Sequence, residues 1–123
     1  MDLDDLNKSV THAILQAEAF PCGSWEAQHA FREVADLEEE IATIAGAGVV
    51  EGEIARLGAV TAAMSAGEPL RAIQLGGRYL ADELSASARA KLEELVDEAN
   101  AEIDREAADG PSVAPIRFNL RAA

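Results

Sequence analysis

Two residues with metal-ligand chemistry, Glu26 and His29, stand three positions apart in the sequence. On a helix this spacing places a carboxylate and an imidazole on the same face, and helix bundles build metal sites from such pairs together with further glutamates. A divalent metal ion bound here would need ligands from a second chain or from another helix, where His12 and Glu18 are available. Glutamate is also favoured in the first turn of any helix, because it stabilises the macrodipole. A polar surface role for this pair is therefore the main expectation, and a metal site is the alternative.

Other reactive residues lack the partners that catalysis requires. Cys22 is the only cysteine, which excludes an internal disulfide and a multi-cysteine zinc site. Its neighbours lack the second cysteine of papain-type proteases, and no histidine follows His29. Glu94 and Asp97 match half of the magnesium motif of all-α nucleotide pyrophosphohydrolases, but the E-x-x-E half does not precede them. The sequence therefore favours a protein that is not an enzyme.

The composition restricts the possible partners. The 123 residues include 23 acidic and 10 basic ones, a formal net charge of −13, which disfavours nucleic acids and anionic membranes as partners. The sequence has no apolar run long enough for a membrane span, and its acidic start is unlike a signal peptide. We therefore expect a cytoplasmic protein. Alanine occupies 26 positions and aromatic residues only five, which predicts an all-α fold. Abundant alanine and glycine, with arginine preferred to lysine, indicate a bacterial source.

Hydrophobic periodicity and helix-stopping residues predict a compact bundle of about five helices in residues 1–110. The expected helices run from about Asp4 to Phe20, from a cap at Ser24 to the glycines at 46 and 48, from Val50 to Ser65, from Leu70 to Leu84 after Pro69, and from Ser85 or Ser87 to about Ala108. The paired glycines at 76 and 77 indicate either a kink or close helix crossing, or a locally frayed helix. An alanine-rich core must pack its helices closely or gain buried area from a second chain, so we expect a homo-oligomer.

Apolar residues at helical spacing predict the buried faces. The residues expected to face inward are Leu6, Val10, Ala13, Ile14 and Ala17 in the first helix, Phe31, Val34, Leu37, Ile41 and Ile44 in the second, Val50, Ile54, Leu57, Val60 and Met64 in the third, Leu70, Ile73, Leu80 and Leu84 in the fourth, and Ala88, Leu92, Leu95, Ala99 and Ile103 in the fifth. Trp25, at the start of the second helix, is also expected to pack in the core.

Residues 111–123 differ from the rest of the chain. The first 110 residues hold all 23 acids and eight bases, whereas the last 13 hold no acid and two arginines. Three large apolar residues alternate there with polar ones, which is the pattern of an extended segment. A disordered terminus is the alternative, because chain ends often fray, but such an end has no need of three alternating large apolar residues. We therefore expect a docking tail whose contact residues are Ile116, Arg117, Phe118, Leu120 and Arg121. The sequence leaves open whether it binds its own body, a twin subunit or another protein.

The function predicted from these features is that of a non-enzymatic interaction module with a basic protein partner, bound through an acidic surface and the tail. Accessory subunits, adaptors or chaperones, and antitoxin or immunity-type inhibitors belong to this class. No cofactor is expected. The alternative is a small helical metal-binding protein or enzyme, with a divalent metal held between chains by Glu26 and His29.

Overall fold

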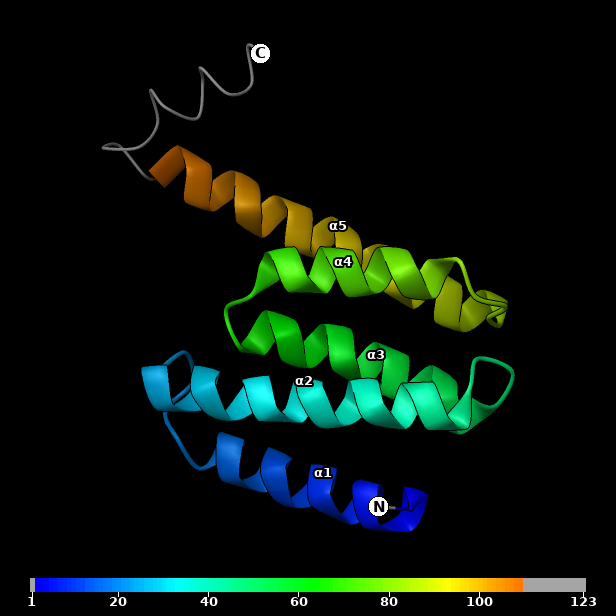
Figure 1. Cartoon of the computed structure of the whole chain (residues 1–123). Coiled ribbons are helices and arrows are strands. Elements are labelled where there is room, and N and C mark those ends of the chain that lie inside the picture. Colours follow the sequence, from blue (N-terminus) through cyan, green and yellow to red (C-terminus); the bar gives the residue numbers. More distant parts are fainter. Residues whose placement is uncertain (1, 110–123) are drawn as a thin grey trace.

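The computed structural model describes residues 2–109, which form five α-helices and no strand (Figure 1). The helices are α1 (Leu3–Glu18), α2 (Trp25–Ala45), α3 (Val50–Ser65), α4 (Pro69–Leu80) and α5 (Ala86–Asp109). The predicted all-α fold of five helices is confirmed. The predicted docking tail, residues 111–123, lies outside the described residues.

Polar caps and a proline set the helix starts. Asp2, Ser24 and Ser85 precede α1, α2 and α5, and each side chain accepts a hydrogen bond from the N–H three residues later, at 2.9, 3.1 and 3.1 Å. Such caps satisfy backbone donors that have no partner inside the helix. Pro69 occupies the first turn of α4, where its missing N–H costs nothing.

Glycines and one arginine set the helix ends. Gly46 and Gly67 follow α2 and α3 with φ of +77° and +72°, a conformation that glycine adopts without strain. Helix α4 ends at Leu80, earlier than the sequence predicts. The Arg89 guanidinium donates hydrogen bonds to the carbonyls of Leu80 and Asp82 at 2.9 and 3.0 Å, and these bonds stabilise the early end.

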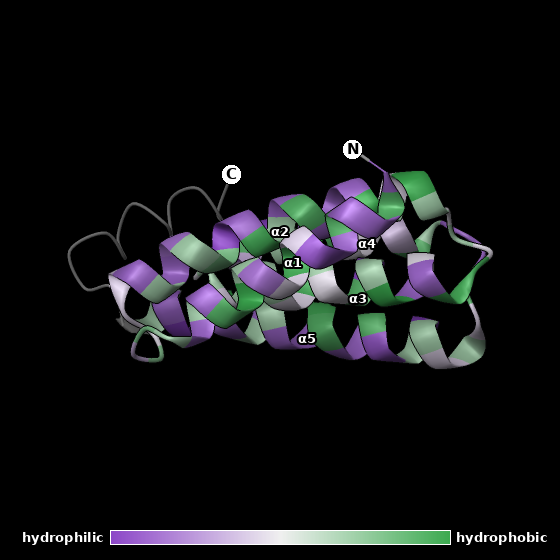
Figure 2. Cartoon of the chain, turned by 90° about the horizontal axis from the view of Figure 1, so that it is seen from below, coloured by the Kyte–Doolittle hydropathy of each residue, from purple (hydrophilic) through white to green (hydrophobic). Residues whose placement is uncertain are grey.

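The helices pack in chain order as neighbours joined by short turns. Helix α1 packs on α2, α2 on α3, α3 on α4 and α5, and α4 on α5. Figure 1 shows α1 at one edge of this array and α5 at the other. Hydrophobic and hydrophilic residues alternate along each helix (Figure 2), as expected for amphipathic helices that bury one face.

Small side chains make much of the core. The buried alanines of the central cluster are Ala13, Ala35, Ala42, Ala55, Ala59, Ala62, Ala63, Ala72 and Ala99, and the largest fully buried side chains with them are Leu6, Ile41, Val60 and Leu92. Such a surface lets backbones approach closely. A Cβ atom at Gly52 in α3 would lie 1.5 Å from the carbonyl oxygen of Gly46, so only glycine fits there.

Most residues predicted to face inward are buried or partly buried in the core, but some large ones are exposed. In α3, Val50 and Ile54 are 71% and 60% exposed, because α3 instead buries the small-residue face that includes Gly52 and Ala59. The other large residues that were expected inside and are exposed are Trp25, Ile44 and Leu70. Close approach to α2 therefore decides the orientation of α3, rather than the size of its apolar side chains.

One of the two glycines inside α4 marks a close helix crossing. A Cβ atom at Gly76 would lie 2.3 Å from Cγ2 of Val96 in α5, whereas a Cβ at Gly77 would meet nothing within 4 Å. The close-crossing interpretation is confirmed for Gly76.

Candidate functional site

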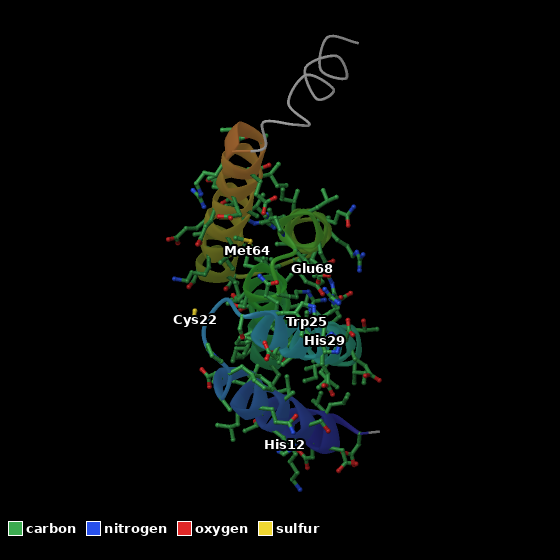
Figure 3. The ribbon with its side chains drawn as sticks, turned by 90° about the vertical axis from the view of Figure 1, so that its left-hand side faces the viewer. His12, Cys22, Trp25, His29, Met64 and Glu68 are labelled. Atoms are coloured by element: carbon green, nitrogen blue, oxygen red, sulfur yellow. The ribbon has the colours of Figure 1, made fainter. Side chains whose placement is uncertain are left out.

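Glu26 and His29 lie in the first two turns of α2, and both side chains are exposed. The imidazole of His29 stacks on the indole of Trp25, with ring centroids 5.5 Å apart and planes 9° from parallel. Figure 3 shows Trp25 and His29 together on α2 and His12 on α1. His12 faces a different part of the surface, beside Lys8. The structure therefore pairs His29 with an aromatic ring rather than with a second histidine.

These residues line a shallow cavity of about 480 Å³. We call it the Trp25 hollow, and it is lined by Gln16, Ala19, Phe20, Trp25, Glu26, His29, Ala30 and Glu33. Trp25 is 73% exposed and Phe20 is 41% exposed. The core position predicted for Trp25 is wrong because the cap at Ser24 fixes the start of α2 so that Ala27, and not Trp25, faces inward. The hollow thus presents two aromatic rings beside carboxylates.

Glu26 and His29 supply only two of the ligands that a metal site would need. Within residues 2–109, no group of three or more histidine, cysteine, aspartate and glutamate side chains is arranged to hold a metal ion. A metal ion at Glu26 and His29 would need ligands from a second chain. That interpretation stays a prediction.

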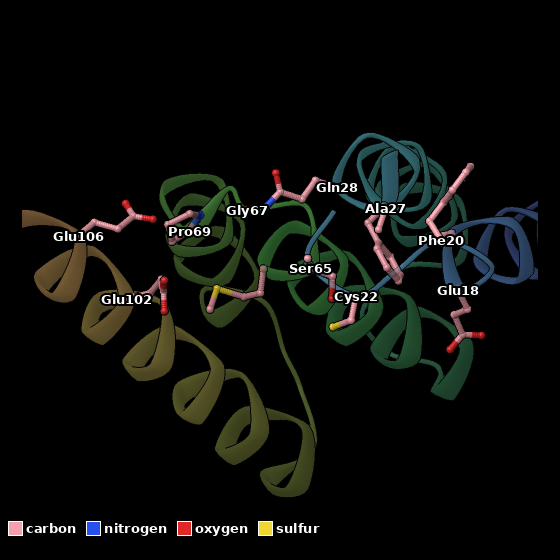
Figure 4. Close-up of a pocket in the computed structure, with 14 residues that line it drawn as sticks. Glu18, Phe20, Cys22, Ala27, Gln28, Ser65, Gly67, Pro69, Glu102 and Glu106 are labelled. Carbon is pink, nitrogen blue, oxygen red and sulfur yellow. The ribbon is translucent and has the colours of Figure 1, made fainter. Parts of the chain in front are cut away.

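A second cavity, of about 660 Å³, joins three segments that are far apart in the sequence. We call it the α5 groove. It is lined by Ala17, Glu18, Phe20, Cys22, Gly23, Ala27, Gln28, Phe31, Met64, Ser65, Gly67, Pro69, Glu102 and Glu106. Figure 4 shows Glu102 and Glu106 of α5 at one end, and Phe20 and Glu18 at the other. Phe31 and Met64 are half-buried in it. The groove therefore combines apolar side chains with carboxylates at both ends.

A group of aliphatic side chains is exposed at the other end of the α2–α3 hairpin. Its members are Ile44, Val49, Val50 and Ile54. They flank the turn between the two helices, and the Trp25 hollow lies at the opposite end of α2. The α2–α3 hairpin thus carries apolar surface at both ends.

An ion-pair cluster links α2 to α4. The Arg71 guanidinium contacts Asp36 at 2.6 Å, Glu68 at 3.3 Å and Glu39, and Arg32 contacts Glu68 at 3.0 Å. Partial burial lowers the pKa of the Arg71 guanidinium, but the hydrogen bonds that it donates to the three carboxylates outweigh this effect and raise the pKa. Arg32 and Arg71 therefore form ion pairs with carboxylates of the same chain.

Glu38 is a carboxyl group in an unusual environment. It is half-buried on α2 and covers Gly58 of α3, where a Cβ atom would lie 1.7 Å from Glu38 Oε2. Burial raises the pKa of Glu38 to about 7, because loss of water disfavours the charged form. Glu38 thus titrates in a range where ordinary carboxyl groups are already ionised.

Sequence reasoning placed Glu26 and His29 on one helix face correctly and missed both cavities. The Trp25 hollow forms because the turn from Phe20 to Trp25 places both aromatic rings outside the core, and helical periodicity does not predict the path of such a turn. The predicted partner-binding residues of the tail lie outside the described residues.

Comparisons of this chain with protein-family models, with curated proteins and with solved structures found no match. In residues 2–109, no helix is long and apolar enough to cross a membrane.

Proposed function

We propose that this protein is a non-enzymatic helical interaction module that binds a basic protein partner. The acidic surface attracts the partner, and the Trp25 hollow receives an apolar side chain from it. An accessory subunit, an adaptor or chaperone, and an antitoxin or immunity-type inhibitor all work in this way.

The observation that carries the proposal is the exposure of Trp25 beside Phe20. An aromatic side chain of this kind can bury about 150–250 Å², and leaving it in water forgoes a large hydrophobic stabilisation. Tryptophan is enriched among the residues that dominate binding energy at protein interfaces. A 73% exposed tryptophan in a hollow with a second ring is therefore suited to anchor a partner.

Charge supports a basic partner. Residues 1–110 hold 23 acids against eight bases, and arginines of α2 and α4 are already paired with carboxylates. Glu26 and Glu33 line the hollow itself. Such a surface speeds the encounter with a basic protein and makes binding depend on salt.

The test uses the full chain, tagged, as bait in an extract of its source, with identification of the bound protein and measurement of its Kd. We expect Trp25→Ser to weaken binding of that protein by about thirtyfold, the equivalent of about 2 kcal/mol. Raising the salt from about 0.05 to 0.5 M should weaken it further, because screening removes the charge attraction.

The matched control is Val50→Ser, which removes an equally exposed apolar side chain at the far end of the α2–α3 hairpin. It should leave the Kd unchanged. Equal loss of binding in both variants, or binding of an acidic protein, would contradict the proposal.

A further inference from the structure

The α5 groove lies where the chain leaves its last helix. Glu102 and Glu106, in the last two turns of α5, line the groove, and α5 ends at Asp109. The following residues therefore start next to one end of the groove. Gly110 and Pro111 come first, and this pair of residue types favours a turn, which a chain needs in order to fold back along its own helix.

The tail is long enough to follow the groove. Residues 111–123, when extended, can span about 43 Å. Because the tail is tethered at Asp109, its local concentration at the groove is on the order of millimolar even without specific contacts. Weak contacts are thus enough to hold it there.

The chemistry of the groove matches that of the tail. Ile116, Phe118 and Leu120 fall on one side of an extended segment, and Arg117 and Arg121 on the other. The groove offers apolar contacts from Phe20, Phe31 and Met64, and carboxylates from Glu18, Glu102 and Glu106. Arg105 pairs with Glu102 from the solvent side, and a carboxylate can accept from a second guanidinium as well.

The volume is also sufficient. A cavity of about 150 Å³ holds a benzene molecule, so a groove of about 660 Å³ has room for several large side chains. Residues 2–109 cover the large apolar residues of the groove only in part, because Phe31 and Met64 are half-buried and Phe20 is exposed.

We propose that the α5 groove is the binding site for this chain's own C-terminal tail, residues 111–123. Ile116, Phe118 and Leu120 contact its apolar residues, and Arg117 and Arg121 pair with carboxylates at its ends. This goes beyond the proposed function, because a tail seated in the groove is a property of the isolated chain and is measured without any partner.

The first experiment uses Cys22, which is the only cysteine of the chain, is exposed and lines the groove. Its rate of reaction with a disulfide reagent such as DTNB is measured in the full-length protein.

In a variant with Ile116→Ser, Phe118→Ser and Leu120→Ser we expect about a tenfold faster reaction, which corresponds to about 1.4 kcal/mol of tail binding. Val113→Ser, an apolar substitution outside the alternating segment, is the control and should react like the unmodified chain. Equal rates in all three proteins would overturn the proposal.

The second experiment asks whose tail lies in the groove. Asn119→Cys places a thiol in the tail without removing an apolar contact, and mild oxidation then forms a disulfide with Cys22. A disulfide within one chain, formed about ten times more slowly when the three serine substitutions are added, supports the proposal. A disulfide between two chains, or a rate that the serine substitutions do not change, overturns it. Neither experiment involves the Trp25 hollow, so failure here leaves the proposed function intact.

Discussion

Arg56 is the residue at which most parts of the fold meet. It is buried, its Nε–H donates to Asp82 at 3.0 Å, and its Nη1 donates to the carbonyls of Ala42 and Gly52 at 3.2 and 3.0 Å. The guanidinium also lies over the ring of Tyr79, 5.2 Å from its centre. One side chain thus connects α2, α3, α4 and the turn that precedes α5. Its spacing in the sequence gave no sign of this role, because a single arginine among acids is most often a surface residue.

Removing this side chain should weaken the whole fold. We expect Arg56→Leu to lower the free energy of unfolding by about 2–4 kcal/mol, because buried acceptors lose their donor. Chemical denaturation followed by circular dichroism measures the change. Arg105→Leu removes an exposed arginine that, within residues 2–109, forms an ion pair only with a neighbour on its own helix, and its denaturation curve should match that of the unmodified protein. A stable Arg56→Leu protein would show that the core does not depend on this contact.

The raised pKa of Glu38 should make the free energy of unfolding depend on pH. Because burial raises its pKa from 4.5 to about 7, the folded state holds its proton more tightly than the unfolded state. The group therefore stabilises the fold below about pH 4.5, and this contribution is lost as the pH rises through about 7. Glu38→Gln should accordingly become more stable relative to the unmodified protein between about pH 5 and pH 8, by up to about 1 kcal/mol, because solvent reaches the half-buried carboxyl group and weakens the effect.

Thermal unfolding at a series of pH values tests this expectation. Glu40→Gln, on an exposed residue of the same helix, is the matched control and should show no such trend. A constant difference between Glu38→Gln and the unmodified protein across that range would mean that Glu38 is ordinarily ionised in the fold.

At the scale of the elements, helix ends could be predicted from the sequence and helix orientation only in part. Ser24, Pro69 and Gly46 fix their boundaries through local backbone chemistry, which needs no knowledge of the neighbours. Orientation depends on the partner helix. In α3 the small-residue face lets α2 approach, so Val50 and Ile54 are left outside despite their size. In α1 the predicted face is correct, because Leu6, Val10, Ala13 and Ala17 are buried against α2.

The two adjacent glycines of α4 provide a paired test of close packing. Gly76→Ala should lower the free energy of unfolding by about 1–3 kcal/mol, because the stiff side chain of Val96 occupies the space that the new methyl needs. Gly77→Ala meets open space and should raise it by up to about 1 kcal/mol through helix propensity. Equilibrium denaturation distinguishes the two, and equal effects would contradict the close crossing of α4 and α5.

At the scale of the whole molecule, the Trp25 hollow and the α5 groove form where helix ends and turns meet. No sequence motif marks either of them. The Trp25 hollow joins the end of α1 to the start of α2, and the α5 groove adds residues more than 70 positions later, such as Glu106. Spacing within one helix predicted the pair Glu26 and His29, but no local pattern indicates which distant segments share a cavity. The homo-oligomer expected from the alanine-rich core stays a prediction.

The measurement that tests the central claim most directly is a native mass spectrum of the full chain purified from its source under low salt and without denaturation. We expect a complex that contains this 13.0 kDa chain together with a basic polypeptide, and loss of that polypeptide from the Trp25→Ser protein prepared in the same way. A spectrum that shows only this chain, alone or in multiples of its own mass, would contradict the proposed function.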